Sequence, residues 1–409
     1  MTDQEFLEAA LGLEAPWRLD RADFDPEAER VDLYLAFERG ARFPCPVCER
    51  ASCPVRDTKE RTWRHLNLFQ HHSFVHARVP RVICPDHGVH QVHIPWAREG
   101  SGFTLLFEAL VMGLLPQMPV RSAARFLGEH DTRIWRVIHY YVGRARSQRS
   151  MANVRAIGVD ETSALRGQDY ITLVVDLDTR AVLFATPGRG ADTLAAFAKD
   201  LSEHGGDPAN ITEVCCDMSH HYIQGTAENF PNAQITFDRY HIVQMVSRAV
   251  DEVRRHEASS RPKLLRNTRY LWLKNPENLT VKQAATLEYL QTREDTLYTV
   301  RAYRWRLLFN AFFEQPSRDQ AEAYLQEWCK RVNQSRLLPF KGVVRTIRQH
   351  WEGILRWHTS RINNGLLEGI NSLVQAAKRK ARGYRTKANL IVMTYLIAGK
   401  LQLVITHTK

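Results

Sequence analysis

Three short apolar segments in the middle of the chain each end in an aspartate, and this pattern restricts the fold more than any other feature. The segments are residues 157–160, 213–217 and 233–238, which end at Asp160, Asp217 and Asp238. Short apolar runs with polar flanks are typical of buried strands. Carboxylates at neighbouring strand ends offer the oxygen ligands that magnesium prefers. The sequence therefore predicts an α/β domain with an acidic site at one edge of its sheet.

The order of elements around these acids indicates which strands are neighbours. The predicted elements are strands at 157–159, 170–176 and 181–185, a helix at 194–201, and then the two further strands that end in acids. This β-β-β-α-β order suggests a mixed sheet in which the fourth strand lies beside the first. We therefore expect Asp217 to be the partner of Asp160. Asp238 is the alternative second acid, and Glu161 is expected to support Asp160 or to replace it.

A late segment supplies a further carboxylate from a helix. Helical periodicity starts near Asn364, with Glu368 in the early turns and Asn371 three residues on along the same face. Two metal ions about 3.5–4 Å apart can activate water on one side of a phosphodiester and stabilise the leaving oxygen on the other. Asp160, Asp217 and Glu368 are the best set of ligands for such a pair. The cations of the basic tail that follows, expected to contact DNA phosphates, are Lys378, Arg379, Lys380, Arg382, Arg385 and Lys387.

Two pairs of soft ligands precede the acidic segments. Cys45 and Cys48 form one pair and Cys84 and His87 the other, each with two residues between the ligands. This spacing is typical of the knuckles that hold one tetrahedral zinc ion. Four protein ligands leave no open position for water, so we expect a structural role. Residues that could replace one of the four ligands are Cys53 and His90.

A helix-turn-helix pattern lies between the cysteine pairs and the first acid. Residues 119–127 and 132–141 have helical periodicity, and a turn containing Gly128 joins them. If the second helix enters a DNA groove, Arg133 and Arg136 near its start would contact the DNA. An ordinary helical hairpin explains the local pattern equally well. The cations expected to form a basic linker after it are Arg144, Arg146 and Arg149.

The charge balance favours a polyanionic partner. The chain has 56 Lys and Arg against 45 Asp and Glu, a net charge of +11, and the positive charge is clustered. The periodicity of residues 240–361 predicts helices, and in this stretch the Lys and Arg residues alternate with aromatic residues. That mixture suits a DNA-gripping surface or solvated helix faces with aromatics inside. No run approaches the roughly 18 apolar residues of a membrane span, and no secretion signal is visible, so we expect a cytoplasmic protein.

The motifs together resemble one known family. The chain contains, in order, CPVC, WRHL, CPDHG, IGVDETS, CCDMS, FDRYH and NNGLLEGINSLVQAAKRKARGYR. This ordered set is similar to the DDE transposases of bacterial insertion sequences, specifically the ISL3 family. The resemblance implies an RNase H-like catalytic core with a large all-helical insertion, preceded by a zinc-binding β module and a helix-turn-helix. It also implies Asp160, Asp217 and Glu368 as the metal-binding triad, with Asp238 a rival for the second position.

The expected domains follow from this resemblance and from the composition. They are a zinc-binding domain at 1–100, a helix-turn-helix region with basic linker at 101–150, the first part of the core at 151–240, a helical insertion at 241–360, and the glutamate-bearing helices of the core at 361–409.

The expected function is transposition of an insertion sequence in the bacterial cytoplasm, in association with the nucleoid. The protein would bind terminal inverted repeats, cleave phosphodiesters with two Mg²⁺ or Mn²⁺ ions, and join 3′-hydroxyl ends to target DNA. The resemblance implies a homodimer or larger assembly that brings two ends together. Two alternatives stay open: an inactive DNA-binding regulator of the same fold, and a nuclease that never joins ends.

Overall fold

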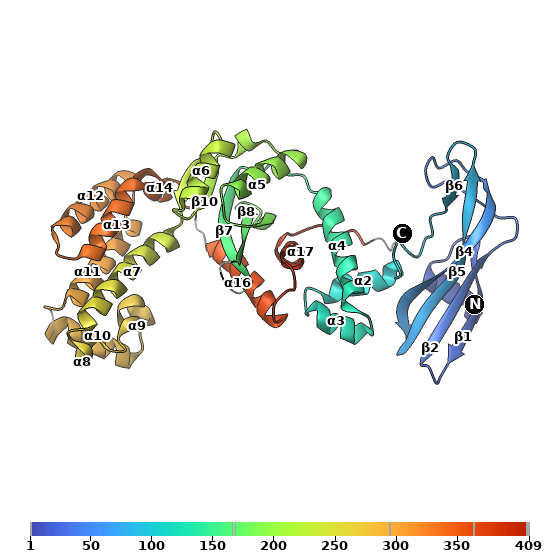
Figure 1. Cartoon of the computed structure of the whole chain (residues 1–409), viewed down its shortest axis with the longest axis horizontal. Helices are drawn as coiled ribbons and strands as arrows, with labels where there is room; N and C mark the ends of the chain where they lie inside the picture. The colour runs from blue at the N-terminus through green and yellow to red at the C-terminus, as the bar shows by residue number, and fades with distance from the viewer. Residues whose placement is uncertain (1, 166, 168, 294–295, 363–364, 406–409) are drawn as a thin grey trace. The chain divides into compact units, whose positions relative to one another are not determined.

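The chain folds into two compact units, and the structure is a computed structural model. It describes residues 2–165, 167, 169–293, 296–362 and 365–405. One unit comprises the residues up to Ala145 together with the C-terminal residues from Gln402, and the other runs from Arg146 to Leu401 (Figure 1). Within the described ranges, no helix is both long and apolar enough to cross a bilayer.

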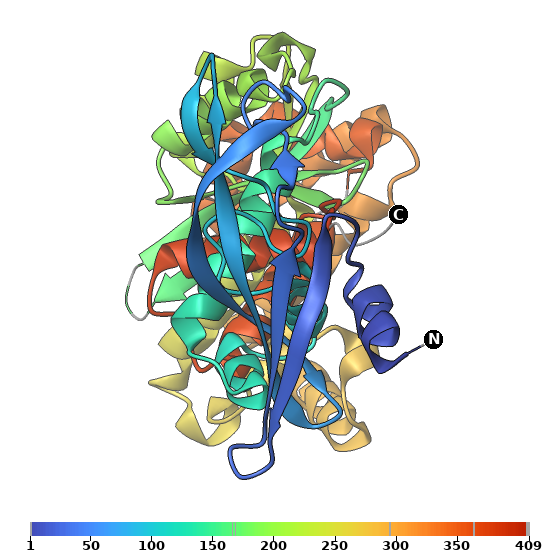
Figure 2. The ribbon, with the colours of Figure 1, turned by 90° about the vertical axis from the view of Figure 1, so that its right-hand side faces the viewer.

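The first unit is built on a twisted sheet. Its strands are β1 (Trp17–Asp25), β2 (Arg30–Phe37), β3 (Arg42–Phe43), β4 (Cys53–Leu68), β5 (His71–Cys84) and β6 (Gly88–Gln91). The strand order is β1-β2-β5-β4-β3, and β6 pairs with β5. The long antiparallel hairpin of β4 and β5 forms the centre of this unit and twists visibly along its length (Figure 2). Alternate residues of β2 are buried, which gives the sheet one apolar face.

Helices precede and follow this sheet. They are α1 (Asp3–Leu11), α2 (Leu105–Leu114), α3 (Val120–Leu127) and α4 (Asp131–Ser147). The helix α2 starts where the Thr104 side chain accepts a hydrogen bond from the Phe107 backbone, an ordinary N-cap. Gly128, at φ 70°, ends α3 in the left-handed region and allows the sharp turn into α4.

The second unit contains a five-stranded mixed sheet. Its strands are β7 (Ala156–Leu165), β8 (Asp169–Asp176), β9 (Ala181–Pro187), β10 (Glu213–Cys216) and β11 (Gln234–Phe237), in the order β11-β10-β7-β8-β9. Strands β7, β10 and β11 are parallel, whereas β8 and β9 are antiparallel to their neighbours. The predicted meander of three strands is confirmed, and so is the prediction that the fourth strand lies beside the first.

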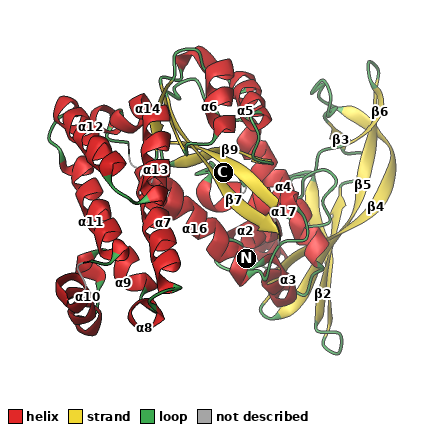
Figure 3. Cartoon of the chain, turned by 60° about the vertical axis from the view of Figure 1, so that its left-hand side comes forward, coloured by secondary structure: helices red, strands yellow, loops and turns green. Residues whose placement is uncertain are grey.

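Helices cover both faces of this sheet (Figure 3). The helices α5 (Asp192–Glu203) and α6 (His220–Asn229) cover one face, where Phe197 of α5 packs against Phe184 of β9. The helices α16 (Gly365–Lys380) and α17 (Lys387–Ala398) cover the other, and the Tyr395 hydroxyl of α17 accepts a hydrogen bond from the Ala185 backbone. The expected start of α16 at Asn364 lies outside the described residues.

The chain between β11 and α16 is helical. The α-helices are α7 (Arg239–Ala258), α8 (Pro262–Leu265), α9 (Arg269–Leu273), α10 (Val281–Arg293), α11 (Tyr298–Asn310), α12 (Arg318–Gln334), α13 (Leu338–Gln349), α14 (Trp351–Leu355) and α15 (Trp357–Ser360). Two short 3₁₀ turns, η2 (Pro276–Asn278) and η3 (Ala311–Glu314), lie between these helices, and a third, η1 (Pro208–Asn210), lies earlier in the chain, before β10. Helix α14 packs close to β11, and Gly353 makes this possible, since a Cβ at this position would lie only 2.4 Å from the Phe237 ring. The buried core is continuous from the sheet into these helices.

Two local expectations are corrected by the structure. The strand β7 does not end at Asp160 but continues to Leu165, because β8 pairs with it along the whole length. The residues expected as a basic linker include the last turn of α4, where Arg144 is exposed, while Arg146 and Arg149 are anchored within the second unit. Arg146 contacts Asp200 at 2.5 Å, and Arg149 donates to the Gly399 carbonyl at 2.9 Å.

Candidate active site and zinc centre

The acidic site begins on β7, where two adjacent acids point to opposite faces of the sheet. Successive side chains of a strand alternate in direction. Asp160 faces α16, and its Oδ2 accepts a hydrogen bond from Asn371 Nδ2 at 2.6 Å. Glu161 faces α6, and its Oε1 accepts a hydrogen bond from the Tyr222 hydroxyl at 2.9 Å. The two acids therefore have separate surroundings despite being neighbours in sequence.

A row of polar side chains holds α16 along β7. After Asn371, Gln375 Nε2 donates to Thr162 Oγ1 at 2.8 Å, and Lys378 Nζ donates to the Ser163 carbonyl at 2.6 Å. These residues lie on one face of the helix, three to four positions apart. Glu368 lies on the same face, three residues before Asn371. The contacts that hold α16 against β7 therefore also fix the position of Glu368 relative to the strand.

Gly158 allows this close packing. A Cβ at this position would lie 2.5 Å from Leu367 Cδ1, so the Leu367 side chain would have to shift. Leu367 is buried and lies next to Glu368 in the helix. The glycine two residues before Asp160 therefore lets the glutamate-bearing helix approach the strand.

Asp217 follows β10 directly and reaches the site from the neighbouring strand. The parallel pairing of β10 with β7 runs from Ala156 to Gly158 and stops there, so that Asp217 and Asp160 both lie just beyond the last pair. Asp217 Oδ1 accepts the Ser219 backbone hydrogen bond at 2.8 Å, and the side chain is half-buried. Its negative charge raises the pKa values of both Asp160 and Glu161.

Asp238 follows β11 and begins α7. Its Oδ1 accepts a hydrogen bond from the Tyr240 backbone at 3.0 Å, which caps the helix. The residue is 3% exposed, and its Oδ2 has no hydrogen-bond partner among the described residues. The Nε2 atom of His241 lies 3.6 Å from Oδ2. Asp238 is therefore tied into the fold more deeply than Asp217.

The acids repel one another electrostatically. Burial, followed by the charges of Asp238 and Asp217, raises the pKa of Asp160 to about 6. Burial and the charge of Asp238 also raise the pKa of Glu368, and His241 opposes both shifts. A group of carboxylates with little positive charge beside it is suited to binding divalent cations. The buried Asn371 Oδ1, which has no partner among the described residues, adds a further oxygen beside Asp160.

The zinc centre lies in the first unit. One ligand atom from each of Cys45, Cys48, Cys84 and His87 lies within 4.8 Å of the other three, and this is the one such cluster found among the described residues. The Cys48 and Cys84 sulfurs are 3.8 Å apart, and His87 Nδ1 lies 3.6 Å from Cys84 Sγ. Tetrahedral zinc with bonds of about 2.3 Å to sulfur requires ligand separations near these values. The four predicted residues thus fit one zinc ion.

The alternative zinc ligands have other contacts. The Cys53 thiol is buried and lies 3.6 Å from the Arg50 carbonyl, to which it donates. His90 Nε2 contacts the His87 carbonyl at 2.8 Å. Both lie next to the cluster, but neither belongs to the group of four.

The predicted DNA-contacting arginines of α4 differ in their surroundings. The Arg133 guanidinium pairs with Glu129, donates to the Gly102 carbonyl at 3.1 Å and lies 4.1 Å from the centre of the Phe103 ring. Arg136 is exposed on the same helix. Arg133 therefore stabilises the turn before α4, whereas Arg136 faces solvent.

The cations of the basic tail also fall into two groups. Lys387 forms an ion pair with Asp169 at 2.6 Å and so joins the start of α17 to β8. The remaining residues, at the end of α16 and just after it, are Lys378, which is half-buried, and the exposed Lys380, Arg379, Arg382 and Arg385. Among the helices of residues 240–361, Arg306 is 2% exposed and donates to the Leu273 carbonyl, so this cation has a structural role.

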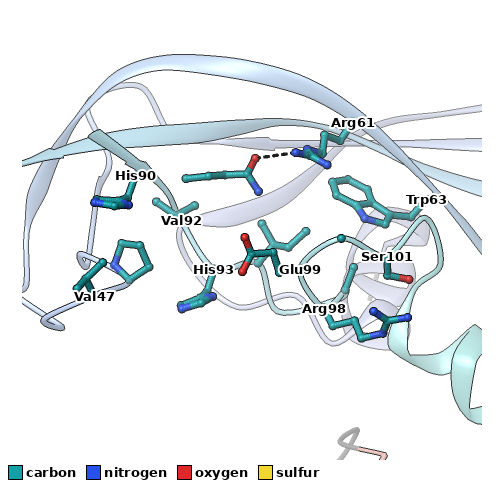
Figure 4. Close-up of a pocket in the computed structure, with 14 residues that line it drawn as sticks. Val47, Arg61, Trp63, His90, Val92, His93, Arg98, Glu99 and Ser101 are labelled. Atoms are coloured by element: carbon teal, nitrogen blue, oxygen red, sulfur yellow. Dashed lines mark hydrogen bonds between the residues drawn. The ribbon is translucent and has the colours of Figure 1, made fainter. Parts of the chain in front are cut away.

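A groove of about 230 Å³ lies beside the zinc centre (Figure 4). Val47 of the first cysteine pair lines one end of it, and Arg98 and Ser101 of the segment before α2 line the other. Arg61 closes one wall by donating to Gln91 Oε1 at 3.2 Å. The groove therefore separates the zinc-binding end of the unit from the segment that leads into the helix-turn-helix.

Sequence reasoning did not identify several residues of the acidic site. Tyr222 lies 61 positions from Glu161, and Gln375 lies 213 positions from Thr162, so only the fold reveals these contacts. The sequence did contain a local signal for His241. It lies three residues after Asp238, the aspartate that caps α7, and therefore on the same face of the helix.

Comparisons with known proteins agree with this arrangement. The model of the ISL3 DDE family, described as a transposase, matches residues 157–394, which is more than half of the chain. A helix-turn-helix domain of transposase family ISL3 matches residues 92–142, and the zinc-finger of transposase IS204/IS1001/IS1096/IS1165 matches residues 41–87. These matches confirm the helix-turn-helix and, with the Cys/His cluster, support structural zinc.

Curated relatives cover nearly the whole chain. The transposase for insertion sequence element IS1557 of Mycobacterium tuberculosis is 29% identical, over 87% of this chain and 86% of its own length. The transposase for insertion sequence element IS1001 of Bordetella parapertussis is 27% identical, over 94% of this chain and 96% of its own. The protein thus belongs to the ISL3 family of insertion-sequence transposases, with a helix-turn-helix DNA-binding domain.

Proposed function

We propose that the acidic site cleaves DNA at the ends of an insertion sequence and joins the freed 3′-hydroxyls to target DNA. In this proposal Asp160, Asp217 and Glu368 hold two Mg²⁺ or Mn²⁺ ions. The observation that carries it is that Asp160 of β7 lies within electrostatic reach of Asp217 and Asp238, and Glu368 of α16 within reach of Asp238, with His241 as the neighbour that opposes their repulsion. Bound ions would activate the attacking oxygen and stabilise the leaving oxygen of a phosphodiester.

The choice of Asp217 over Asp238 rests on accessibility. Both acids raise the pKa of Asp160, so both lie within electrostatic reach of it. Asp238 uses one oxygen to cap α7 and buries the other, whereas Asp217 is half-buried and comes from the strand beside β7. We assign Asp217 to the metal and Asp238 to the support of α7 and His241.

The remaining polar residues would orient the ligands. Asn371 donates to Asp160 Oδ2, and the Glu161 backbone donates to Oδ1 at 2.8 Å, so both oxygens of this carboxylate are already oriented. Tyr222 donates to Glu161, which supports the site from the opposite face of the sheet. A ligand that is already hydrogen-bonded loses little freedom on binding a cation, as in other metal sites.

The other parts of the chain would handle the DNA. We assign residues 1–100 to a zinc-binding domain, 101–150 to the helix-turn-helix region, 151–240 and 361–409 to an RNase H-like core, and 241–360 to a helical insertion in that core. The core assignment is supported by the β7-β8-β9-α5-β10 order and by the strand neighbours. Joining two ends requires a dimer or larger assembly, because one acidic site acts on one strand at a time.

A joined-product assay separates this proposal from its alternatives. The substrate is a duplex that carries the terminal inverted repeat from the DNA flanking this reading frame, mixed with a supercoiled target plasmid and magnesium. We expect nicks at the repeat end and covalent joining of that end to the plasmid. Cleavage without joining would indicate a nuclease, and metal-independent binding without cleavage would indicate a regulator.

A further inference from the structure

A second cavity lies at the far end of the contact between α16 and β7. Its volume is about 690 Å³, within the range of sites that enclose a small ligand. Ser163, Ala164 and Leu165 of β7 form one side, and the end of α16 with the turn after it forms the other. The residues of that second side are Lys378, Arg379, Arg382, Gly383, Tyr384 and Arg385.

The cavity combines cations with an aromatic ring. Among the described residues, no carboxylate lies within ion-pair distance of Lys378, Arg379 or Arg382. Lys378 Nζ instead donates to the carbonyl of Ser163, and burial lowers the pKa of its ammonium group. Tyr384 is half-buried, and Leu165 is 40% exposed. An anionic ligand with a flat apolar part would therefore satisfy this lining.

The position of the cavity relates it to the acids. Glu368 and Lys378 are ten residues apart on one helix, which corresponds to about 15 Å at about 1.5 Å per residue. Along the strand, Ser163 and Leu165 are three and five residues beyond Asp160, or about 10–17 Å at about 3.3 Å per residue. Successive base pairs of DNA are about 3.4 Å apart. Measured along the helix or along the strand, the cavity therefore lies about three to five base pairs from the acids.

We propose that this cavity binds one unstacked nucleotide of the insertion-sequence end, a few positions from the cleaved bond. The phosphate would contact Lys378 and Arg382, and the base would pack against Tyr384 and Leu165. Taking a base out of the duplex costs a few kcal/mol, which charge neutralisation and stacking on an aromatic ring can offset. The inference rests on the proposed function, because it takes the acids as the place of cleavage.

The test uses 2-aminopurine, whose fluorescence rises when it leaves the base stack. The base is introduced one position at a time, on both strands, within six positions of the repeat end. Binding is measured without magnesium, so that the reading requires end binding but no cleavage. We expect a several-fold rise at one position with the wild-type protein, and little change at the others.

Three variants identify the cavity as the cause. Tyr384→Ala should reduce the fluorescence rise by about 10-fold, the scale of lost base stacking, while Tyr384→Phe should keep it. Arg382→Asn removes a charge at a position with φ 58°, where asparagine is tolerated, and should also reduce the rise. Lys199→Gln, an exposed cation on α5, is the matched control for net charge and should have no effect.

Each outcome decides between the proposals. The absence of any unstacked position in the bound wild-type complex would overturn the nucleotide cavity, as would a signal unchanged in both Tyr384→Ala and Arg382→Asn. If Tyr384→Ala does not fold, Arg382→Asn alone decides. A normal fluorescence rise in a protein that does not cleave with magnesium would sink the cleavage proposal and leave the cavity standing. Failure to bind the end at all would remove both.

Discussion

The zinc centre and the acidic site arrange their side chains under opposite structural conditions. The zinc ligand atoms lie within 4.8 Å of one another, and two of the three cysteines, Cys45 and Cys84, are 1% exposed. The acids come from separate elements, and burial together with their mutual repulsion raises the pKa of Asp160. One site is a closed set of soft ligands, and the other is an open set of hard oxygens.

From this difference we expect the zinc centre to contribute to stability and the acidic site to contribute to the chemical reaction. A closed tetrahedral site has no position for a substrate, so its metal can only hold the chain together. The acids have His241 beside them and depend on the surrounding helices for their arrangement, with Asn371 joining Asp160 to α16. We therefore expect loss of zinc to affect folding and DNA binding, and loss of magnesium to affect cleavage strongly and thermal stability only slightly.

The largest effect on DNA binding should come from removing one zinc ligand. Cys48→Ser should lose stoichiometric zinc and weaken binding to the repeat end by at least about 100-fold, because zinc contributes about 10–16 kcal/mol to small modules of this kind. Metal analysis and fluorescence anisotropy with end DNA measure the two losses. Cys53→Ser is the matched control, since Cys53 is buried beside the cluster but outside it. Zinc loss in the control and not in Cys48→Ser would reverse the ligand assignment.

An intermediate effect is expected from the contact that orients Asp160. Asn371→Ala should reduce cleavage by about 10- to 100-fold, the usual cost of losing a residue that orients a metal ligand, with end binding unchanged. Gln375→Ala is the control, because Gln375 lies one turn further along α16 and contacts Thr162 rather than an acid. Equal losses in both variants would indicate that α16 has simply shifted.

The smallest effect is a pH-dependent change in thermal stability. The folded pKa of Asp160, about 6, is above the ordinary 3.8, so its contribution to stability in metal-free protein is present below about pH 4 and lost as pH rises through about 6. Magnesium competes with that proton. It should therefore raise the melting temperature by a few degrees at about pH 7.5 and by less at about pH 5. Calorimetry at both pH values measures this, and an equal rise at both, or in Asp160→Asn, would contradict it.

The sequence predicted the zinc ligands and the neighbouring strands better than the surroundings of the acids. Cysteine spacing is a local signal, and acids after apolar runs mark strand ends reliably at Asp217 and Asp238. The signal was misleading at Asp160, where β7 continues through a polar segment because β8 pairs with it.

Long-range contacts were beyond the sequence for a physical reason. The partners of Glu161 and Asp160, Tyr222 and Asn371, lie 61 and 211 positions away, and no periodicity links such positions. The structural role of Arg133 was equally hidden, because an arginine at a helix start looks the same whether it faces DNA or pairs with Glu129.

The central claim is that Asp160, Asp217 and Glu368 hold the metal ions for cleavage, while Asp238 supports the fold. The most direct measurement is strand cleavage on end-containing DNA by Asp160→Asn, Asp217→Asn, Asp238→Asn and Glu368→Gln, with end binding measured in parallel. We predict a loss of about three orders of magnitude in the three ligand variants, on the scale of several kcal/mol of transition-state stabilisation, and a smaller loss in Asp238→Asn. Near-wild-type cleavage by Asp160→Asn or Glu368→Gln would contradict the account, and a severe loss in Asp238→Asn with an active Asp217→Asn would move the second ligand to Asp238.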